Sequence, residues 1–386
     1  MKIGILTLWQ SNDNYGQQLQ CWALQQVLLL LGHDPYLIKY DIDHRVLNKP
    51  AWWKKVLKMV LIYPAVKSFR RKLRVKKDAD EINEITKKNK IRAFEAFRKD
   101  NIRMSDYVYK SLQDLKNNPP LADAYIVGSD QVWAHLLDYS ENRAMYLDFG
   151  DKDTKRIAYA PSFSMPVYPD KYKQQLKENL ARFNSLSVRE QTGVGICQEL
   201  GYMPQVVVDP TMLLRKENYQ EIEQPVDEKS YIYLYYLNIS ETEEVEWKQL
   251  HRYAHEGDMK IIATPASGYI TGKELFEDVE YVYATIPQWI SLIDNAKIVV
   301  TTSFHGVVFC ILHHTPFVYF PLNGKYSRGN NRVVDLCNML NLKDRIWSET
   351  SSFEKMSNQP VDWDIVDAIM DSKRTESIEY LNNSLS

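Results

Sequence analysis

The sequence predicts an α/β protein of two Rossmann-like, doubly wound domains with a central cleft. Two observations predict this class: short apolar strands alternate with helical patterns, and the alternation occurs twice, before and after the polar segment 215–230. The length agrees, because 386 residues exceed what one hydrophobic core usually organises. We therefore expect two parallel sheets, each covered by helices on both faces.

The N-terminal domain is expected to span residues 1–214 and to open with a βαβ unit. A strand at Lys2–Leu8, a helix at Gln17–Leu31 and a strand at Tyr36–Tyr40 form this unit. An insert at 48–100 follows, with a polar helix at about 78–99. The later strands are expected at Ala124–Val127, Arg156–Tyr159, Leu186–Val188 and Val206–Val208, and the later helices at Asp170–Phe183 and Glu190–Leu200.

The C-terminal domain is expected at 231–345, after a linker at 215–230 and before a helical tail at 346–386. The linker is polar and contains Pro225. The expected strands are Tyr231–Leu237, Lys260–Thr264, Ala296–Thr301 and Pro316–Phe320. The expected helices are Glu241–Glu256, Ile286–Asn295, Phe304–His313, Asn331–Leu340 and one from about Asp362.

The composition is typical of a soluble globular protein. With 45% hydrophobic and 25% charged residues and a net charge of −2, the chain is not disordered, and no general nucleic-acid binding is expected. No uncharged apolar run reaches the length of a membrane span, and the start lacks a signal-peptide pattern. The four cysteines make no Cys-x-x-Cys pair, so we expect buried thiols. These features predict a cytoplasmic protein.

One segment departs from this average. Trp52–Lys77 contains ten lysines or arginines and no acidic residue, interleaved with apolar side chains. This pattern favours a helix that lies on an anionic membrane surface, which would place the protein peripherally on the inner face of the membrane. The alternative is a solvated basic helix that packs on its own domain by one apolar face. The Trp52-Trp53 pair and the absence of acids favour the membrane.

Ligands of such folds bind at the carboxyl ends of strands, so the loops at those ends are candidate sites. The first loop contains Asp13, Asn14, Tyr15 and Gly16, and Gly16 is expected to let backbone amides at the helix start approach a ligand. A simple helix cap is the alternative interpretation.

The second loop follows the strand at Ala124–Val127. It contains several hydrogen-bonding groups and a tryptophan: Gly128, Ser129, Asp130, Gln131 and Trp133. A plain turn seldom needs so many polar groups, although Asp130 alone is also typical of a helix cap.

The third and fourth loops carry candidate anion-binding groups. Arg189 stands at a strand end, where its planar guanidinium suits a carboxylate or phosphate, and pairing with a nearby acid is the alternative. In the fourth loop, Ser303 and His305 lie at the start of an apolar helix, whose free amides and dipole favour an anion. A single histidine is more often structural, but this one coincides with a cluster of hydroxyl groups at a strand end.

Common metal and nucleotide motifs are absent from the sequence. It contains no P-loop, no Gly-x-Gly-x-x-Gly, no His-Glu-x-x-His and no Gly-x-Ser-x-Gly. Paired carboxylates such as Asp41 and Asp43 fall at apparent turns, where such pairs arise by chance. We therefore assign no metal and no cofactor.

Six short motifs follow one another along the chain. They are Asn14-Tyr15-Gly16, Gly128-Ser129-Asp130-Gln131-Val132-Trp133, Tyr159-Ala160-Pro161-Ser162-Phe163, Ser187-Val188-Arg189-Glu190, Val208-Asp209-Pro210-Thr211 and Ser303-Phe304-His305-Gly306. Each motif is weak alone, but the ordered set resembles the polysaccharide pyruvyl transferase family over roughly residues 1–345, with the basic segment as an addition.

This resemblance implies a GT-B-like fold and transfer of a pyruvyl group from phosphoenolpyruvate to hydroxyls of a sugar, usually as a cyclic ketal. It also implies that Arg189 and His305 serve the donor. Better-known members carry Arg-Leu-His where this chain has Ser303-Phe304-His305, so one expected arginine is missing. Its replacement is expected among Lys325, Arg328 and Arg332 in the following polar loop.

These expectations combine into one assignment of roles. His305 is expected to be the acid, with Asp130 or Asp13 orienting or deprotonating the sugar hydroxyl. The expected donor-binding residues are Arg189, Ser303, Phe304, Gly306, Lys325, Arg328 and Arg332. The expected acceptor-binding residues are Asn14, Tyr15, Gly16, Gly128, Ser129, Gln131 and Trp133, and the expected acceptor is a lipid-linked oligosaccharide.

Two other functions compete with this interpretation. One is a sugar-nucleotide glycosyltransferase on the same architecture, and the other is a membrane-recruited glycan-binding protein without catalysis. Only the missing arginine supports the latter.

Overall fold

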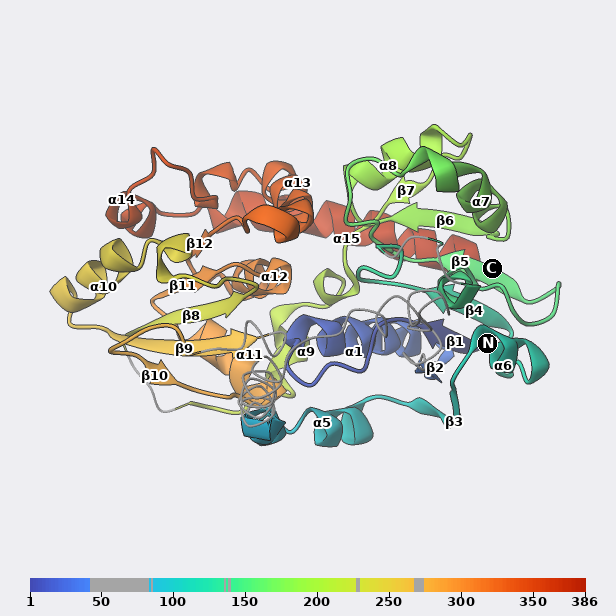
Figure 1. Ribbon diagram of the computed structural model, residues 1–386, viewed down its shortest axis with the longest axis horizontal. Coiled ribbons are helices and arrows are strands. Elements are labelled where there is room, and N and C mark those ends of the chain that lie inside the picture. Colours follow the sequence, from blue (N-terminus) through green and yellow to red (C-terminus); the bar gives the residue numbers. More distant parts are fainter. Residues whose placement is uncertain (42–82, 85, 135–136, 138–139, 227–229, 267–273) are drawn as a thin grey trace, which may run out of the picture.

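The structure, a computed structural model, describes residues 1–41, 83–84, 86–134, 137, 140–226, 230–266 and 274–386. The basic segment Trp52–Lys77 lies outside these residues. Figure 1 shows two sheets side by side, with the sheet of the N-terminal half on the right and that of the C-terminal half on the left. Both sheets are entirely parallel and flanked by helices, which confirms the predicted fold class.

The first sheet has seven strands in the order β3-β2-β1-β4-β5-β6-β7. Their bounds are β1 Lys2–Leu6, β2 Asp34–Tyr40, β3 Met104–Tyr109, β4 Ala124–Val127, β5 Lys155–Ala158, β6 Ser185–Val188 and β7 Gln205–Val206. The order reverses direction between β1 and β4, which pair in parallel from Ile3 and Ala124 to Leu6 and Val127. The loops that follow these two strands are therefore neighbours at the switch point.

The second sheet has five strands in the order β10-β9-β8-β11-β12. Their bounds are β8 Tyr231–Leu237, β9 Lys260–Ala266, β10 Glu280–Tyr281, β11 Ile298–Thr301 and β12 Phe317–Tyr319. Its switch point lies between β8 and β11, so the segments after Leu237 and Thr301 are adjacent.

Helices connect most of the strands. Their bounds are α1 Tyr15–Leu30, α5 Phe94–Asn101, α6 Leu112–Asn117, α7 Asp170–Leu180, α8 Gln191–Gln198, α9 Lys216–Gln220, α10 Trp247–Glu256, α11 Ile286–Asp294, α12 Phe304–His313, α13 Asn331–Met339, α14 Phe353–Asn358 and α15 Trp363–Leu385. No helix in the described part of the chain combines the length and apolarity that a membrane crossing requires.

The two sheets share one hydrophobic core. In β8, Tyr231, Tyr233 and Tyr235 face a core cluster that also contains α1, α11 and α12 residues, whereas Ile232 and Leu234 face a separate cluster on the other side of the sheet. This alternation is the period of two expected for a strand. Because the shared cluster extends to Ile3 and Ile5 of β1, apolar packing continues from one sheet to the other.

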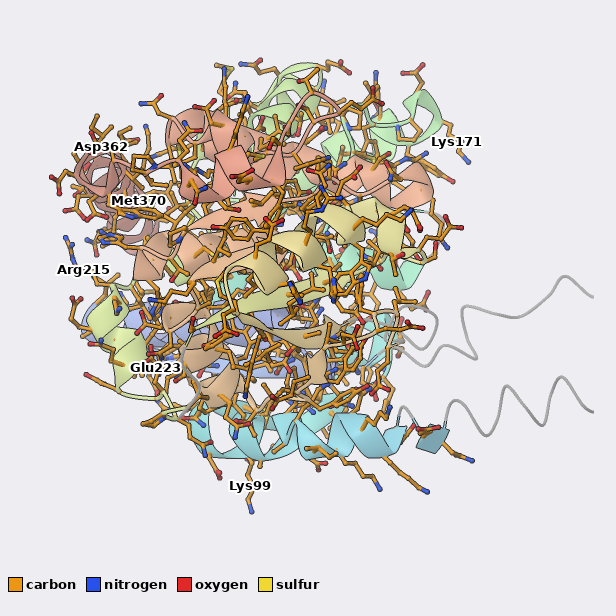
Figure 2. The ribbon with its side chains drawn as sticks, turned by 90° about the vertical axis from the view of Figure 1, so that its left-hand side faces the viewer. Lys99, Lys171, Arg215, Glu223, Asp362 and Met370 are labelled. Atoms are coloured by element: carbon orange, nitrogen blue, oxygen red, sulfur yellow. The ribbon has the colours of Figure 1, made fainter. Side chains whose placement is uncertain are left out.

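The C-terminal helix α15 returns to the first sheet, as Figure 1 shows. Tyr380 donates its hydroxyl proton to the carbonyl of Ala158 at 2.9 Å, and the Ser377 hydroxyl accepts from the amide of Val208 at 3.1 Å. Figure 2 shows Arg215 at the same edge of the molecule as Met370, and Arg215 pairs with Asp371 at 2.8 Å. The last helix therefore bridges the linker region and the N-terminal half.

Several local features differ from the sequence expectation. Helix α9 lies within the expected linker, and strand β10 was not predicted. Edge strand β3 and helix α6 were not predicted, because Met-Ser-Asp-Tyr-Val-Tyr is partly exposed and lacks a clear apolar alternation. The helix expected at Glu241–Glu256 is interrupted at Glu246, which has a left-handed backbone with φ 50°. The insert was expected to run to residue 100, but Phe94 and Phe97 are buried in the shared core.

Candidate active site

A cavity of about 330 Å³ lies where the carboxyl ends of the two sheets meet. Side chains from both halves line it, among them Asn14, Asp130, Gln131, Ser303, His305 and Arg332. These residues come from the loops at the two switch points and from α13. The position agrees with the rule that ligands of open α/β sheets bind at strand carboxyl ends.

The first turn of α12 forms one wall of this cavity. Ser303 caps the helix by accepting from the amide of Gly306 at 3.3 Å. A Cβ atom at Gly306 would lie 2.4 Å from Oγ1 of Thr301, so a glycine is needed for this close approach. The amides of Phe304 and His305 have no hydrogen-bond acceptor within the described residues. They supply the free donors expected of an anion site at a helix start.

Asp209 is the centre of the polar cluster behind this wall. Its side chain is fully buried, and Oδ2 accepts from Ser129 Oγ and from Arg189 Nη1, both at 2.8 Å. Oδ1 accepts from the amide and the hydroxyl of Thr211. Burial acts to raise the pKa of Asp209, but the charges of His305 and Arg189 outweigh it and lower the pKa well below its usual range. Asp209 is therefore a permanent carboxylate.

His305 lies between this carboxylate and the start of α1. Its Nε2 is buried and 3.6 Å from Asp209 Oδ2, without a hydrogen bond to any described residue. On the other side, a Cβ atom at Gly16 would lie 2.0 Å from the imidazole Nδ1. Gly16 therefore makes room for the imidazole ring at the start of α1. Of the two ring nitrogens, Nε2 faces Asp209 and Nδ1 faces Gly16.

Arg189 is used differently from the expectation. We expected it to face a donor from the wall opposite to His305, but its Nη1 binds Asp209, the carboxylate that His305 also faces. Its Nη2 lies 3.6 Å from Asp130, its Nε lies 3.7 Å from Glu190, and its side chain is 3% exposed. Burial acts to lower the pKa of Arg189, yet the surrounding carboxylates raise it. The alternative interpretation, pairing with nearby acids, describes this geometry.

The cations that line the cavity come from the C-terminal half. Lys325, Arg328 and Arg332, the three candidates for the missing arginine, all line it. Lys325 and Arg328 are exposed, whereas the Arg332 side chain is 13% exposed. Burial and the charge of Arg189 lower the pKa of Arg332. Phe304 lies between these two arginines, with its ring centroid 4.5 Å from the Arg189 guanidinium and 5.7 Å from that of Arg332.

Asp130, Gln131 and Asn14 supply the polar groups of the N-terminal wall. Asp130 has a left-handed backbone with φ 69°, and its carboxylate lies 4.0 Å from Arg332. With its amide oxygen turned toward Arg332, Gln131 accepts from both terminal nitrogens, at 2.5 and 2.7 Å. Asn14 caps α1 by accepting from the amide of Gln17, and the same residue lines the cavity.

Four residues expected to bind the acceptor lie inside the fold: Tyr15, Gly128, Ser129 and Trp133. None of them belongs to the cavity lining in the described part of the chain. Tyr15 donates to the carbonyl of Ala284, and Trp133 donates to that of Met145. Gly128 has φ +111°, where only glycine fits easily, and Ser129 holds Asp209. Their polar groups position the walls.

Asp13 also stands apart from the cavity lining. Its Oδ1 accepts from Ser11 Oγ at 2.8 Å, within the loop before α1. Of the two carboxylates expected to handle the sugar hydroxyl, the structure places only Asp130 on the cavity wall.

Sequence reasoning assigned no role to Asp209 and Glu190. Both are buried, and Ser162 donates to Glu190 at 2.7 Å. Burial raises the pKa of Glu190 despite the neighbouring Arg189. The signal was available in part, because an acid directly after an apolar strand such as Val206–Val208 needs a buried partner. Which partner it takes depends on strand order.

A second cavity of about 420 Å³ adjoins the first. Phe304 and Arg332 line both cavities, and the second also contains Arg189, Glu190 and Lys373 with several apolar side chains. The two cavities therefore meet at Phe304 and Arg332.

Comparison with solved structures finds similar chains of low sequence identity. UDP-GlcNAc 2-epimerase from Neisseria meningitidis, bound to UDP-GlcNAc, is 9% identical, with a TM-score of 0.42 over 99% of this chain and 100% of that chain. The calicheamicin glycosyltransferase CalG4 is 11% identical, with a TM-score of 0.44 over 100% of this chain and 98% of that chain. No curated protein matches the sequence.

A family comparison gives a match to most of the chain. The sequence model of polysaccharide pyruvyl transferase matches residues 14–323, a range that includes Asn14, Arg189, Asp209 and His305. The protein therefore belongs to the polysaccharide pyruvyl transferase family.

Proposed function

We propose that this protein transfers the pyruvyl group of phosphoenolpyruvate to two hydroxyls of a sugar and closes a cyclic ketal. One observation carries the proposal. A cavity between the sheets presents three cationic side chains and the free amides of α12 on one wall, with His305 beside them. Such a wall suits a small ligand with two anionic groups.

Phosphoenolpyruvate has a carboxylate and a phosphate, so it needs two anion-binding elements. Arg332 presents a planar guanidinium that binds a carboxylate or phosphate through two hydrogen bonds, and the amides of Phe304 and His305 bind the second group. Lys325 and Arg328 stand exposed at the rim of the same cavity. A volume of about 330 Å³ lies at the lower end of the range for small-molecule sites, which favours a small donor.

His305 is the proposed acid for the first step. His305 protonates the methylene carbon of the donor, while Asp209, 3.6 Å from Nε2, orients the ring and stabilises its charged form. The resulting carbocation at the central carbon is attacked by one sugar hydroxyl, which loses its proton. Phosphate then leaves with that proton, and a second hydroxyl closes the ketal and returns a proton to His305. Donor and diol thus give ketal and phosphate.

Asp130 is the proposed base for the sugar hydroxyl. It lies on the N-terminal wall opposite α12, with its carboxylate between Arg189 and Arg332. Gln131 and Asn14 on the same wall offer hydrogen-bonding groups to the sugar. This arrangement separates a donor wall from an acceptor wall.

The proposed acceptor is a lipid-linked oligosaccharide at the inner face of a membrane. The support for this acceptor is the sequence of Trp52–Lys77, whose cations each contribute about 1 kcal/mol at an anionic surface. Liposome sedimentation tests it. Binding should rise with the fraction of anionic lipid and fall when Lys54, Lys55, Arg70, Arg71 and Lys72 are changed to glutamate. If the wild-type protein does not sediment with vesicles of any charge, membrane recruitment is contradicted, whereas the proposed reaction is not.

The reaction is tested with phosphoenolpyruvate and an oligosaccharide library. Phosphorus NMR should show phosphate release, and proton NMR should show the methyl signal of a ketal. His305→Gln should lower the rate by about 100- to 10,000-fold with an unchanged unfolding midpoint. His314→Gln is the matched control, because His314 is exposed and pairs with Asp367 away from the cavity.

A panel of donors separates this reaction from sugar transfer. Phosphoenolpyruvate should raise the melting temperature, and the Arg332→Met variant should lose that increase. Stabilisation by nucleotide sugars but not by phosphoenolpyruvate would replace the proposal with glycosyl transfer. A near-native rate in His305→Gln would remove His305 from the mechanism.

A further inference from the structure

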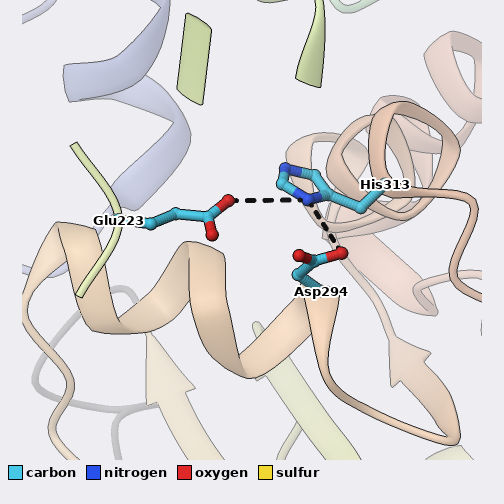
Figure 3. Close-up of side chains that lie close together, drawn as sticks. All are labelled: Glu223, Asp294 and His313. Carbon is cyan, nitrogen blue, oxygen red and sulfur yellow. Dashed lines mark ion pairs between the residues drawn. The ribbon is translucent and has the colours of Figure 1, made fainter. Parts of the chain in front are cut away.

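Three side chains of types that can bind metals lie together at the C-terminal end of α12, whereas His305 lies at its N-terminal end. His313 is the last residue of α12, Asp294 is the last residue of α11, and Glu223 lies in the linker between α9 and β8. Figure 3 shows the carboxylates of Glu223 and Asp294 both directed at the same nitrogen of the His313 ring, Nδ1. The cluster therefore joins three separate segments of the chain.

His313 is buried without a hydrogen bond. Its side chain is 0% exposed, and neither ring nitrogen makes a hydrogen bond within the described residues. Oε1 of Glu223 is also buried and without a hydrogen bond there. Buried polar atoms normally have hydrogen-bond partners, so the absence of such partners around these atoms of His313 and Glu223 needs an explanation.

The distances suit a metal ion better than a proton. Nδ1 lies 3.2 Å from Asp294 Oδ1 and 3.6 Å from Glu223 Oε1. Ligand atoms bound to zinc at about 2.0–2.2 Å in a tetrahedron lie roughly 3.3–3.6 Å apart. A proton on Nδ1 points in one direction and satisfies one carboxylate, whereas a central cation contacts all three ligand atoms. These atoms all lie within 4.8 Å of one another.

We propose that Glu223, Asp294 and His313 bind Zn²⁺, with water in the fourth position. One imidazole and two carboxylates are a donor set for a first-row transition metal, since Mg²⁺ and Ca²⁺ prefer oxygen ligands only. The site is independent of the cavity that holds His305. It would tie the linker to the ends of α11 and α12.

The surroundings of the cluster agree with such a site. The ring centroids of Tyr219 and Phe309 lie 6.5 and 6.1 Å from that of His313, so aromatic side chains surround this imidazole. The Glu223 and Asp294 side chains are 14% and 16% exposed, and Figure 2 places Glu223 at an edge of the molecule, so an ion can reach them from solvent.

Lys216 is the competing cation. Its Nζ contacts Asp294 Oδ1, the same atom that faces His313. An ammonium group there opposes a second cation on the same oxygen. Removing it in Lys216→Met should therefore strengthen metal binding, whereas a cluster held only by ion pairs would gain nothing.

Cobalt absorption and zinc competition test the site. The full chain, stripped with a chelator, should bind one equivalent of Co²⁺ with the strong visible absorption of a tetrahedral complex, and Zn²⁺ should displace it. Glu223→Gln and His313→Gln should each weaken binding at least about 10- to 100-fold. His314→Gln, one residue further on, should not.

Two outcomes would overturn the proposal. One is no stoichiometric Co²⁺ or Zn²⁺ binding by the wild-type chain, and the other is equal binding by wild type and Glu223→Gln. Glu223→Gln is the safer variant for this test, because Glu223 lies on a partly exposed linker and the substitution leaves the buried His313 in place. We therefore expect it to fold. In either case the three residues would not be a metal site.

Discussion

The two halves of the active site use their charges in opposite ways. In the N-terminal half, Arg189 is surrounded by Asp209, Asp130 and Glu190 and is almost entirely buried. In the C-terminal half, Lys325, Arg328 and Arg332 line the cavity beside the free amides of α12. The first half surrounds its arginine with its own carboxylates, whereas the second lines the cavity with cationic side chains.

The two arginines beside Phe304 make this difference concrete. Carboxylates raise the pKa of Arg189, whereas burial and Arg189 itself lower that of Arg332. The folded protein therefore stabilises the charged form of Arg189 and destabilises the charged form of Arg332. An anion bound beside Arg332 would stabilise its charged form. The two arginines therefore differ in their surroundings, and residue type alone does not show which of them would bind an anion.

The largest expected effect follows from removing Arg189. Arg189→Met leaves buried carboxylates without their counter-charge and should lower the free energy of unfolding by about 3–5 kcal/mol. Urea denaturation measures this loss. Arg332→Met is the matched control and should leave stability unchanged or slightly higher. Equal losses in the two variants would show that the two halves do not differ.

A substitution at Gly16 tests the contact between the halves. Gly16→Ala places a methyl group where the His305 ring lies, so the ring must shift. A displacement of about 1 Å costs about 100-fold in kcat, while the affinity for phosphoenolpyruvate should change little. Gly195→Ala in α8 is the control, because nothing lies within 4 Å of the added atom. A normal kcat in Gly16→Ala would show that the ring position does not matter.

The two buried acids beside Arg189 should respond oppositely to pH. Asp209 has a lowered pKa, so its charge stabilises the fold at neutral pH. This contribution begins to fall below pH about 4, the ordinary pKa of an aspartate, and is lost only as the pH passes through the lowered pKa of the folded state. Asp209→Asn should therefore lose about 1.5–3 kcal/mol at pH 7 and less in acid. Glu190 has a raised pKa, so Glu190→Gln should keep or gain stability at pH 7. Unfolding free energies from pH 7 down to about pH 2.5 measure both responses, and parallel losses in the two variants would contradict this assignment.

The smallest effects concern the cavity cations. Arg332→Met should raise KM for phosphoenolpyruvate about 10- to 100-fold, because it removes a charged, mostly buried hydrogen-bond donor. Lys325→Met should raise KM less than about fivefold, and added salt should reduce that effect, because Lys325 is exposed. KM values at two salt concentrations distinguish the variants. A larger effect of Lys325→Met would move the donor site to the rim.

Much of the architecture could be predicted from the sequence because the signals are local. Tyr231–Leu237 was placed residue for residue, since an apolar β-rich run between polar segments has one simple interpretation. Phe304–His313 was placed equally well, because Ser303 is a helix cap directly before an apolar run. The edge strand β3 was missed because partial exposure weakens its apolar pattern.

The site was predicted less completely, for a different reason. The motifs located the loops after β1, β4, β6 and β11, and the structure brings all four loops to one region. They did not show that Arg189 and His305 converge on Asp209, because that contact joins residues far apart in sequence.

The sequence by itself determined most of the strands and helices, the family and the loops that carry the candidate site residues. Only the tertiary structure decided that Tyr15 is buried against Trp289, that Gly16 makes room for His305, and that Arg332 rather than Arg189 lines the cavity beside His305. The physical reason is that secondary structure depends on neighbours along the chain, whereas the partner of a buried charge depends on strand order and on how the two sheets pack together.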